Sequence, residues 1–336
     1  MRGSAFYDRK YLATTNSVYA YLLALCFFCW IAGYVKSLGY PLYGEVTASP
    51  LWNWICQILP DVTTTYLVGI VLMFGGAFFV HRANYVMVLI REKTLLPFLY
   101  YAFFTSTNPD FFPFRSTSIA VFCLILALYF LFGSYHDENA SSRVFNSTLM
   151  IGLGSLLWIH ILWFLPLFWI GMYNFRCLSP RTFLASLLGV SAVYWIVLGW
   201  SVWRADYSMF TVPFSSLVAI HPLRLIGVRW VDWLSIAVVI ALTVISSVNI
   251  MTHENEDSLR SRQFLAFLMV MAIWAFALFF FYEQSSEEFL EMACVPASIL
   301  VAHFFTVVRG KYVLALFHAS TALLFALLIL RIWNFL

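Results

Sequence analysis

Three carboxylates draw attention because each lies in a short polar break between long apolar runs. Glu45 lies in YPLYGEVTASP, Asp61 comes just before an apolar run, and Asp110 lies in STNPDFFPFR, close to Arg115. A carboxylate in such a place can act as a general base that activates a hydroxyl, or bind a divalent cation that holds a pyrophosphate. It can equally be a plain loop carboxylate or a helix N-cap, for which Asp61 and Asp110 are well placed. No set of metal ligands is predicted.

A second group of candidates is basic. In the segment 204–232, Arg204, His221, Arg224 and Arg229 alternate with apolar side chains. Such a pattern is typical of an amphipathic segment that lies in the membrane interface. Because the arginine side chain suits two-point contacts with phosphate, these residues and Arg115 are candidates for binding the phosphate of a lipid. The alternative is an interfacial segment that only touches anionic headgroups.

Composition places all these residues in a membrane protein. Of the 336 residues, 62% are hydrophobic and only 10% are charged, and the mean hydropathy is +0.86. A soluble domain carries roughly 25% charged residues. We therefore expect an all-α, polytopic integral membrane protein, with residues 1–336 forming a single transmembrane domain and with no nucleic-acid partner.

The apolar runs give the expected spans, because about 20 apolar residues cross the hydrocarbon core. They lie near 16–35, 55–80, 116–133, 182–203, 233–251, 264–282 and 312–333, with a slightly short run at 292–308. Two regions do not fit this length. The stretch 94–107 is too short for a full span, and the stretch 144–175 is too long for one helix and short for two.

The distribution of Lys and Arg decides how 144–175 folds, because short cytoplasmic loops collect basic residues. If this stretch is a hairpin with short legs at 144–160 and 162–175, most of the 19 Lys and Arg fall on the side of the N-terminus. One long helix would instead place four later basic residues outside. The sequence thus predicts about 11 crossings, a cytoplasmic N-terminus and a periplasmic C-terminus, with His160 at the hairpin tip near water.

Few polar residues are expected inside the spans. His303 and His318 lie within apolar runs with no acid alongside, and the acids from Glu283 to Glu291 are assigned to an outer loop. Small residues at Gly75–Gly76 and Ala185/Gly189 are expected to let helices approach closely.

The run IGLGSLLWIHILWFLPLFWIGMYNF and the segment REKTLLPFLYYAFFTSTNPDFF carry a resemblance. Over roughly residues 80–190 they resemble an uncharacterised polytopic inner-membrane family of Bacteroidota, and their short paired helices look like the hydrophobic core of GT-C-type glycosyltransferases. The resemblance implies a bacterial inner-membrane protein that acts on polyprenyl-linked glycans at the outer face. It maps the acids that such enzymes carry in the first outer loop onto Glu45 and Asp61.

Three functions remain open at this point. The first is the binding or transfer of lipid-linked glycans, with a membrane lipid or polyprenyl phosphate as partner and a divalent cation as the conceivable cofactor. The second is a non-catalytic subunit that scaffolds an envelope secretion or surface-assembly complex with other membrane subunits. The third is a transporter, which the sequence favours least because it predicts no acid within a span.

Overall fold

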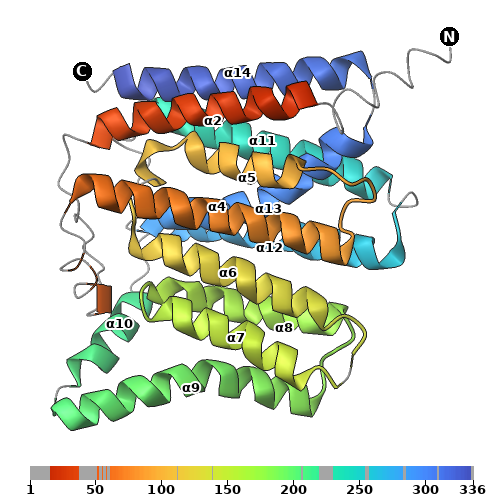
Figure 1. Ribbon diagram of the computed structural model, residues 1–336. Helices are drawn as coiled ribbons and strands as arrows, with labels where there is room; N and C mark the ends of the chain where they lie inside the picture. The colour runs from red at the N-terminus through yellow and green to blue at the C-terminus, as the bar shows by residue number, and fades with distance from the viewer. Residues whose placement is uncertain are drawn as a thin grey trace.

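The computed structural model describes residues 16–37, 51–52, 55, 58, 61–111, 113–137, 139–205, 207–218, 230–253, 257–282, 285–308 and 310–333. Every regular element within these residues is a helix, and they contain no strand. The helices lie side by side with roughly parallel axes (Figure 1). The prediction of an all-α polytopic membrane protein is confirmed.

Eight helices in the described part of the chain are long and apolar enough to cross a membrane. They are α2 (Asn16–Ser37), α4 (Val62–Met87), α6 (Ser116–Gly133), α9 (Pro180–Arg204), α11 (Trp230–Thr252), α12 (Leu259–Phe281), α13 (Ser286–Val307) and α14 (Lys311–Trp333). Two bounds differ from the predicted runs in ways that matter. α4 begins seven residues later than predicted, directly after Asp61. α13 begins six residues earlier and therefore includes three acidic residues.

Shorter elements fill the rest of the bundle. They are α5 (Leu96–Ser106), the 3₁₀ turn η1 (Pro109–Phe111), α7 (Ser141–Ser155), the 3₁₀ helix η2 (Ile159–Phe164), α8 (Leu165–Asn174) and α10 (Ser208–Val218). α5 has 11 residues and is about 16 Å long at 1.5 Å per residue. α10 occupies part of the segment 204–232 for which an interfacial loop was predicted.

The stretch 144–175 folds as a hairpin, as predicted. The backbone N–H of His136, just before α7, donates to the carbonyl of Phe175, just after α8, over 3.0 Å. Nearby, the hydroxyl of Ser134 lies 3.4 Å from the thiol of Cys177. The chain therefore enters and leaves the hairpin at one end of the bundle. The count of about 11 membrane crossings stays a prediction.

Contacts between the helix ends define two ends of the bundle. At one of them, the "Arg115 end", Arg115 at the start of α6 binds Glu288 at the start of α13. At the other, the "Asp257 end", Asp257 before α12 lies beside His303 near the end of α13. Basic residues gather at the Asp257 end, as in Arg91, Lys93, Arg143, Arg176, Arg181, Arg260, Arg262 and Lys311. This asymmetry is the basis for predicting that the Asp257 end is cytoplasmic.

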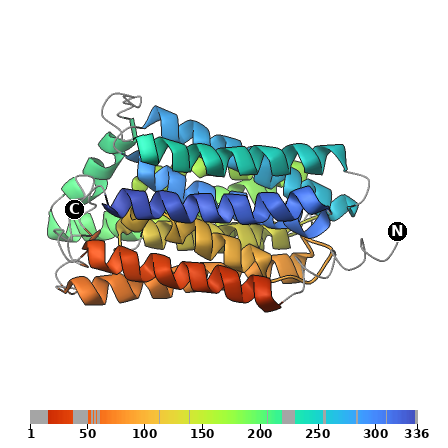
Figure 2. The ribbon, with the colours of Figure 1, turned by 90° about the horizontal axis from the view of Figure 1, so that it is seen from above.

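Helix α13 is the most enclosed of the eight long helices. In the span assigned to it, 94% of the residues are buried inside the protein, against 61% or less for the other seven spans. It packs against α12, α5 and α11 and also touches α6 and α4. On the opposite flank from the hairpin, α14 lies between α2 and α11 (Figure 2). Because α13 is surrounded by other helices, its polar residues must find partners within the protein.

Small residues set the closest helix approaches, as the sequence predicted. A Cβ added at Gly76 of α4 would lie 3.1 Å from both the hydroxyl of Tyr101 and a side-chain carbon of Ile125. A Cβ added at Gly189 of α9 would lie 2.6 Å from the carbonyl oxygen of Phe145 in α7. The prediction of close packing at Gly75–Gly76 and Ala185/Gly189 is confirmed at these two glycines.

Candidate functional site

The candidate site is built around an irregular turn sunk into the Arg115 end. Helix α5 stops at Ser106, whose hydroxyl accepts a hydrogen bond of 2.8 Å from the indole N–H of Trp30. Trp30 lies seven residues before the end of α2, or about 10 Å along its axis. The turn 107–115, described apart from residue 112, therefore begins about 10 Å nearer the middle of the bundle than the end of α2. Irregular backbone at such depth is tolerated only where protein or water surrounds it.

Arg115 forms the charged centre of this turn. Its guanidinium donates to Glu288 over 3.0 Å, to Glu287 over 3.3 Å and to the carbonyl oxygen of Asp110 over 3.3 Å. Glu287 and Glu288 lie in the first turn of α13, where the helix dipole favours negative charge. The Arg115 side chain is 20% exposed, Glu288 is buried and Glu287 is 51% exposed. The cluster thus has a buried side and a rim that faces outward.

A second arginine anchors the other end of the turn. Arg331 of α14 is buried and donates to Asn108 over 2.7 Å and to Asp232 of α11 over 2.6 Å. Its third contact is with the hydroxyl of Ser235, 3.1 Å away. Removing one partner of such a buried pair leaves an uncompensated charge and typically costs about 3–5 kcal/mol. The turn is therefore held at Asn108 and at Arg115, with Asp110 between the two anchors.

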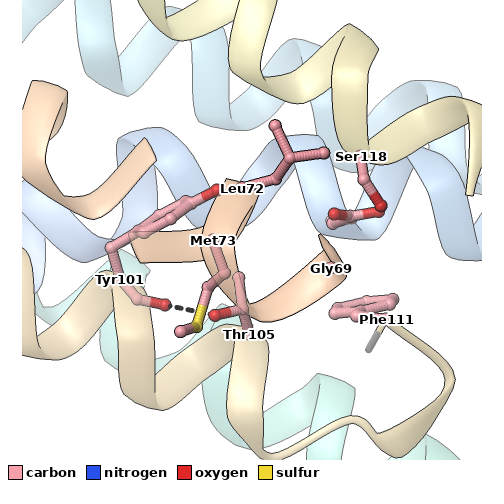
Figure 3. Close-up of a pocket in the computed structure, with 8 residues that line it drawn as sticks. Gly69, Leu72, Met73, Tyr101, Thr105, Phe111 and Ser118 are labelled. Carbon is pink, nitrogen blue, oxygen red and sulfur yellow. Dashed lines mark hydrogen bonds between the residues drawn. The ribbon is translucent and has the colours of Figure 1, made fainter. Parts of the chain in front are cut away.

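A small cavity lies beneath the cluster, between α4, α5, α6 and α13 (Figure 3). Its volume is about 20 Å³, and it is lined by Gly69, Leu72, Met73, Tyr101, Thr105, Phe111, Ser118 and Glu291. Glu291 is 6% exposed and lies about one helical turn further into the protein than Glu288. Thr105 donates to the carbonyl oxygen of Tyr101 over 2.8 Å. The cavity combines a carboxylate with three hydroxyl groups.

The structure brings two of the predicted site residues together. Asp110, half-buried in η1, and Arg115 share one cluster. Asp61 is exposed at the N-cap position of α4 at the same end, but its side chain makes no capping bond. Asp110 does not cap α6 either, because Arg115 holds that position. The N-cap alternative is therefore wrong for Asp110, and for Asp61 only the position agrees.

The other predicted residues are elsewhere. Arg204 ends α9 and lies 5.4 Å from the ring centre of Trp200, on an exposed part of the bundle. Glu45, His221, Arg224 and Arg229 lie outside the described residues. Of the two described residues predicted to bind a lipid phosphate, Arg115 lies among acids and Arg204 lies against Trp200.

Sequence reasoning missed the carboxylates of α13. Glu287, Glu288 and Glu291 were assigned to an outer loop, whereas they belong to the helix and two of them are buried. The expectation of no acid within a span is therefore wrong. Their spacing was the available signal, because residues 288 and 291 are three apart and share one face of a helix that continues into the apolar run.

Two histidines also differ from expectation. His160 was expected near water, but it is 3% exposed and lies among the rings of Trp158, Tyr282 and Phe289. His303 was expected to have no acid alongside, but its Nε2 lies 3.0 Å from a carboxylate oxygen of Asp257. In both cases important neighbours, Tyr282 and Phe289 for His160 and Asp257 for His303, come from distant parts of the chain that apolar periodicity does not place.

Acids outnumber basic residues in the described part of the 107–115 turn and the first turns of α13, with Asp110, Glu287, Glu288 and Glu291 against Arg115. Glu287 and Glu288 bind Arg115, and Arg331 is bound by Asp232. The described residues contain no group of three or more His, Cys, Asp or Glu side chains that could hold a metal ion. The arrangement can supply a carboxylate base and one arginine for an anionic group.

Comparison with protein-family models, with curated proteins and with solved structures finds no match for this chain. The functional argument therefore rests on the geometry of the Arg115 end.

Proposed function

We propose that the protein binds a polyprenyl-linked glycan at the Arg115 end, which we assign to the outer face, and transfers its glycan to an acceptor hydroxyl. The observation that carries the proposal is the recessed turn 107–115, in which Arg115 and Asp110 lie together beneath a partly exposed rim. Such a site suits a substrate whose lipid tail lies in the membrane and whose polar head lies at the membrane surface.

Arg115 is the group that we assign to the phosphate. Its contact with Glu287 lies on the rim, where an exposed ion pair contributes only about 0–1 kcal/mol. A phosphate oxygen can therefore replace Glu287 at low cost, while buried Glu288 keeps the guanidinium in place. The guanidinium can then hold the phosphate through one nitrogen and Glu288 through the other, which the single ammonium nitrogen of lysine cannot reproduce.

Asp110 is the group that we assign as general base. In the proposed step its carboxylate takes the proton of the acceptor hydroxyl while the acceptor oxygen forms a bond to the anomeric carbon of the sugar. The bond between that carbon and the phosphate oxygen breaks, and polyprenyl phosphate or pyrophosphate leaves. The anchors at Asn108 and Arg115 support this role, because a base acts only when it is held within reach of the proton.

The test compares lipid retention and transfer in matched variants. Wild-type protein should co-purify with polyprenyl phosphate detectable by mass spectrometry, and Arg115→Lys should lose most of it. Arg204→Lys is the matched control and should retain the lipid, because Arg204 lies on Trp200 away from the turn. Asp110→Asn should keep the lipid but lower any transfer rate by about 10²–10⁴-fold.

The opposite pattern would favour the scaffold. If wild type and Arg115→Lys carry equal lipid, or neither carries any, the binding proposal fails. Equal thermal stability of the two proteins must accompany the comparison, so that lost lipid is not a sign of lost folding. If the binding proposal fails, a membrane subunit would be sought on the exposed apolar side of α9, where Trp195, Ile196 and Trp203 project.

A further inference from the structure

Two arginines lie close to Met87 at the Asp257 end. The guanidinium of Arg260, in the first turn of α12, donates from one nitrogen to the Met87 sulfur over 3.2 Å. Met87 ends α4, and its Cε lies 3.7 Å from the position that a Cβ at Gly133 would take. The Cδ of Arg143 lies at the same distance from that position. Arg143 and Arg260 therefore lie together where the ends of α4 and α6 meet.

Aromatic rings, rather than an acid, hold Arg260 in place. Its guanidinium carbon lies 5.6 Å from the ring centre of Tyr135 and 5.4 Å from that of Phe264. No carboxylate among the residues that the structure describes forms an ion pair with Arg260. Contacts with ring faces and with a sulfur, which is a weak acceptor, fix a guanidinium but use few of its five N–H groups. Arg260 is exposed, so the remaining N–H groups can donate to an acceptor from outside the chain.

Arg143 has an acidic partner that another anion can replace. One of its guanidinium nitrogens donates to the carbonyl oxygen of Gly133, at the end of α6, and lies 3.6 Å from a carboxylate oxygen of Asp137. The side chains of Arg143 and Asp137 are 55% and 42% exposed. An ion pair between exposed side chains contributes little to stability. A second anion can therefore displace Asp137, and beside Met87 it can contact both guanidinium groups.

Exposed apolar side chains lie next to the two arginines. Tyr85, Val86 and Val88, at the end of α4, are between 39% and 56% exposed. A small soluble anion gains nothing from such side chains, whereas the acyl chains of a lipid can cover them. Basic pockets between transmembrane helices bind the headgroups of anionic lipids. The combination of two arginines and an apolar flank therefore favours a lipid over a soluble anion.

We propose that Arg143 and Arg260 together bind the phosphate of an anionic membrane phospholipid at the Asp257 end. One phosphate oxygen accepts from Arg260 and another accepts from Arg143 in place of Asp137, and an acyl chain lies along the end of α4. The lipid site is at the opposite end of the bundle from Arg115 and shares no residue with the proposed glycan site. It therefore does not rest on the proposed function.

The experiment measures binding of phosphatidylglycerol to the full chain in neutral detergent by native mass spectrometry, with phosphatidylcholine as the uncharged comparison. Wild type should bind the first phosphatidylglycerol more tightly than further molecules and more tightly than phosphatidylcholine. Arg260→Gln and Arg143→Gln should each weaken this first binding about tenfold or more, as expected for a lost hydrogen bond between charged groups.

Lys311→Gln is the matched control, because it removes one positive charge at the same end from α14, which packs on α2 and α11. It should weaken binding by no more than about fivefold, the effect of general attraction between one basic residue and anionic lipid. Equal weakening by Lys311→Gln and Arg260→Gln would overturn the proposal, because it would show attraction to the whole basic end rather than to a site.

A variant that gains affinity keeps the test decisive if the arginine variants do not fold. Asp137→Asn removes the acid that competes for Arg143 but retains the oxygen that accepts from the backbone N–H of Asn139. It should fold normally and bind phosphatidylglycerol severalfold more tightly than wild type. Unchanged affinity in Asp137→Asn, equal binding of phosphatidylcholine, or displacement of the lipid by an equal concentration of inorganic phosphate would each overturn the proposal.

Discussion

The contact between α7 and α9 offers a sharp test of the structure, because it depends on a single missing side chain. An alanine Cβ at Gly189 would overlap the hydroxyl oxygen of Thr148 and lie 2.6 Å from the carbonyl oxygen of Phe145 and 3.0 Å from the backbone nitrogen of Leu149. Two of these three atoms belong to the backbone. They cannot rotate away as the end of a side chain can, so the two helices must separate.

Gly199 is the matched control, since it lies in the same helix and has no atom within 4 Å of an added Cβ. Both substitutions gain the same helix propensity, about 1 kcal/mol for Gly to Ala. Their difference in unfolding free energy therefore reports the steric cost alone, which for an overpacked contact is about 1–3 kcal/mol. We expect Gly189→Ala to be less stable than Gly199→Ala by that amount.

The assay is reversible unfolding in mixed micelles, followed by circular dichroism, on both single variants and on Gly189→Ala combined with Thr148→Ala. The second substitution removes one of the three overlaps but leaves the two backbone contacts, so it should recover only part of the loss. Equal stability of Gly189→Ala and Gly199→Ala would refute the close crossing. Full recovery of stability in the double variant would show that the two backbone contacts do not contribute to the loss.

Two further predictions concern the ends of the bundle. In a cysteine-free background, a cysteine at exposed Tyr207, at the Arg115 end, should react with an impermeant thiol reagent from outside, and one at Asn174 only after permeabilisation; the reverse pattern would invert the predicted orientation. At the Asp257 end, Asp257→Leu should lower the unfolding free energy by about 1–3 kcal/mol, because it leaves the buried Nε2 of His303 without its partner. Asp257→Asn retains an acceptor oxygen and should lose less in the same unfolding assay, and equal losses would contradict the role of that contact.

The elements that the sequence predicted well are those set by length and charge. The short helix at 94–107 and the hairpin at 144–175 followed from apolar runs that did not fit one bilayer thickness and from the side on which basic residues collect. The close approach at Gly189 followed from residue size. Each of these features depends on properties that are local in the sequence or additive along it.

The polar site was only half predictable. Asp110 and Arg115 are five residues apart and were recognised together, but Glu288 lies 173 residues beyond Arg115. The apolar run of α13 was taken to begin after the last acid, since a charged residue ordinarily marks the end of a span. That rule fails here because α13 meets protein on every side and buries its acids against an arginine and a polar cavity.

The way in which the 107–115 turn is held bears on the choice between a site and a scaffold. Apolar contacts would suffice to hold helices together, and a buried ion pair is often no more stabilising than apolar residues of the same size. Yet this turn is held by two arginines, Arg331 at Asn108 and Arg115 at Glu288, from two different helices. Their combined effect is to fix Asp110 at a partly exposed position at one end of the bundle. Fixed polar groups supported by a surrounding shell are what binding and catalysis require, and this is our reason for proposing a binding site rather than a scaffold.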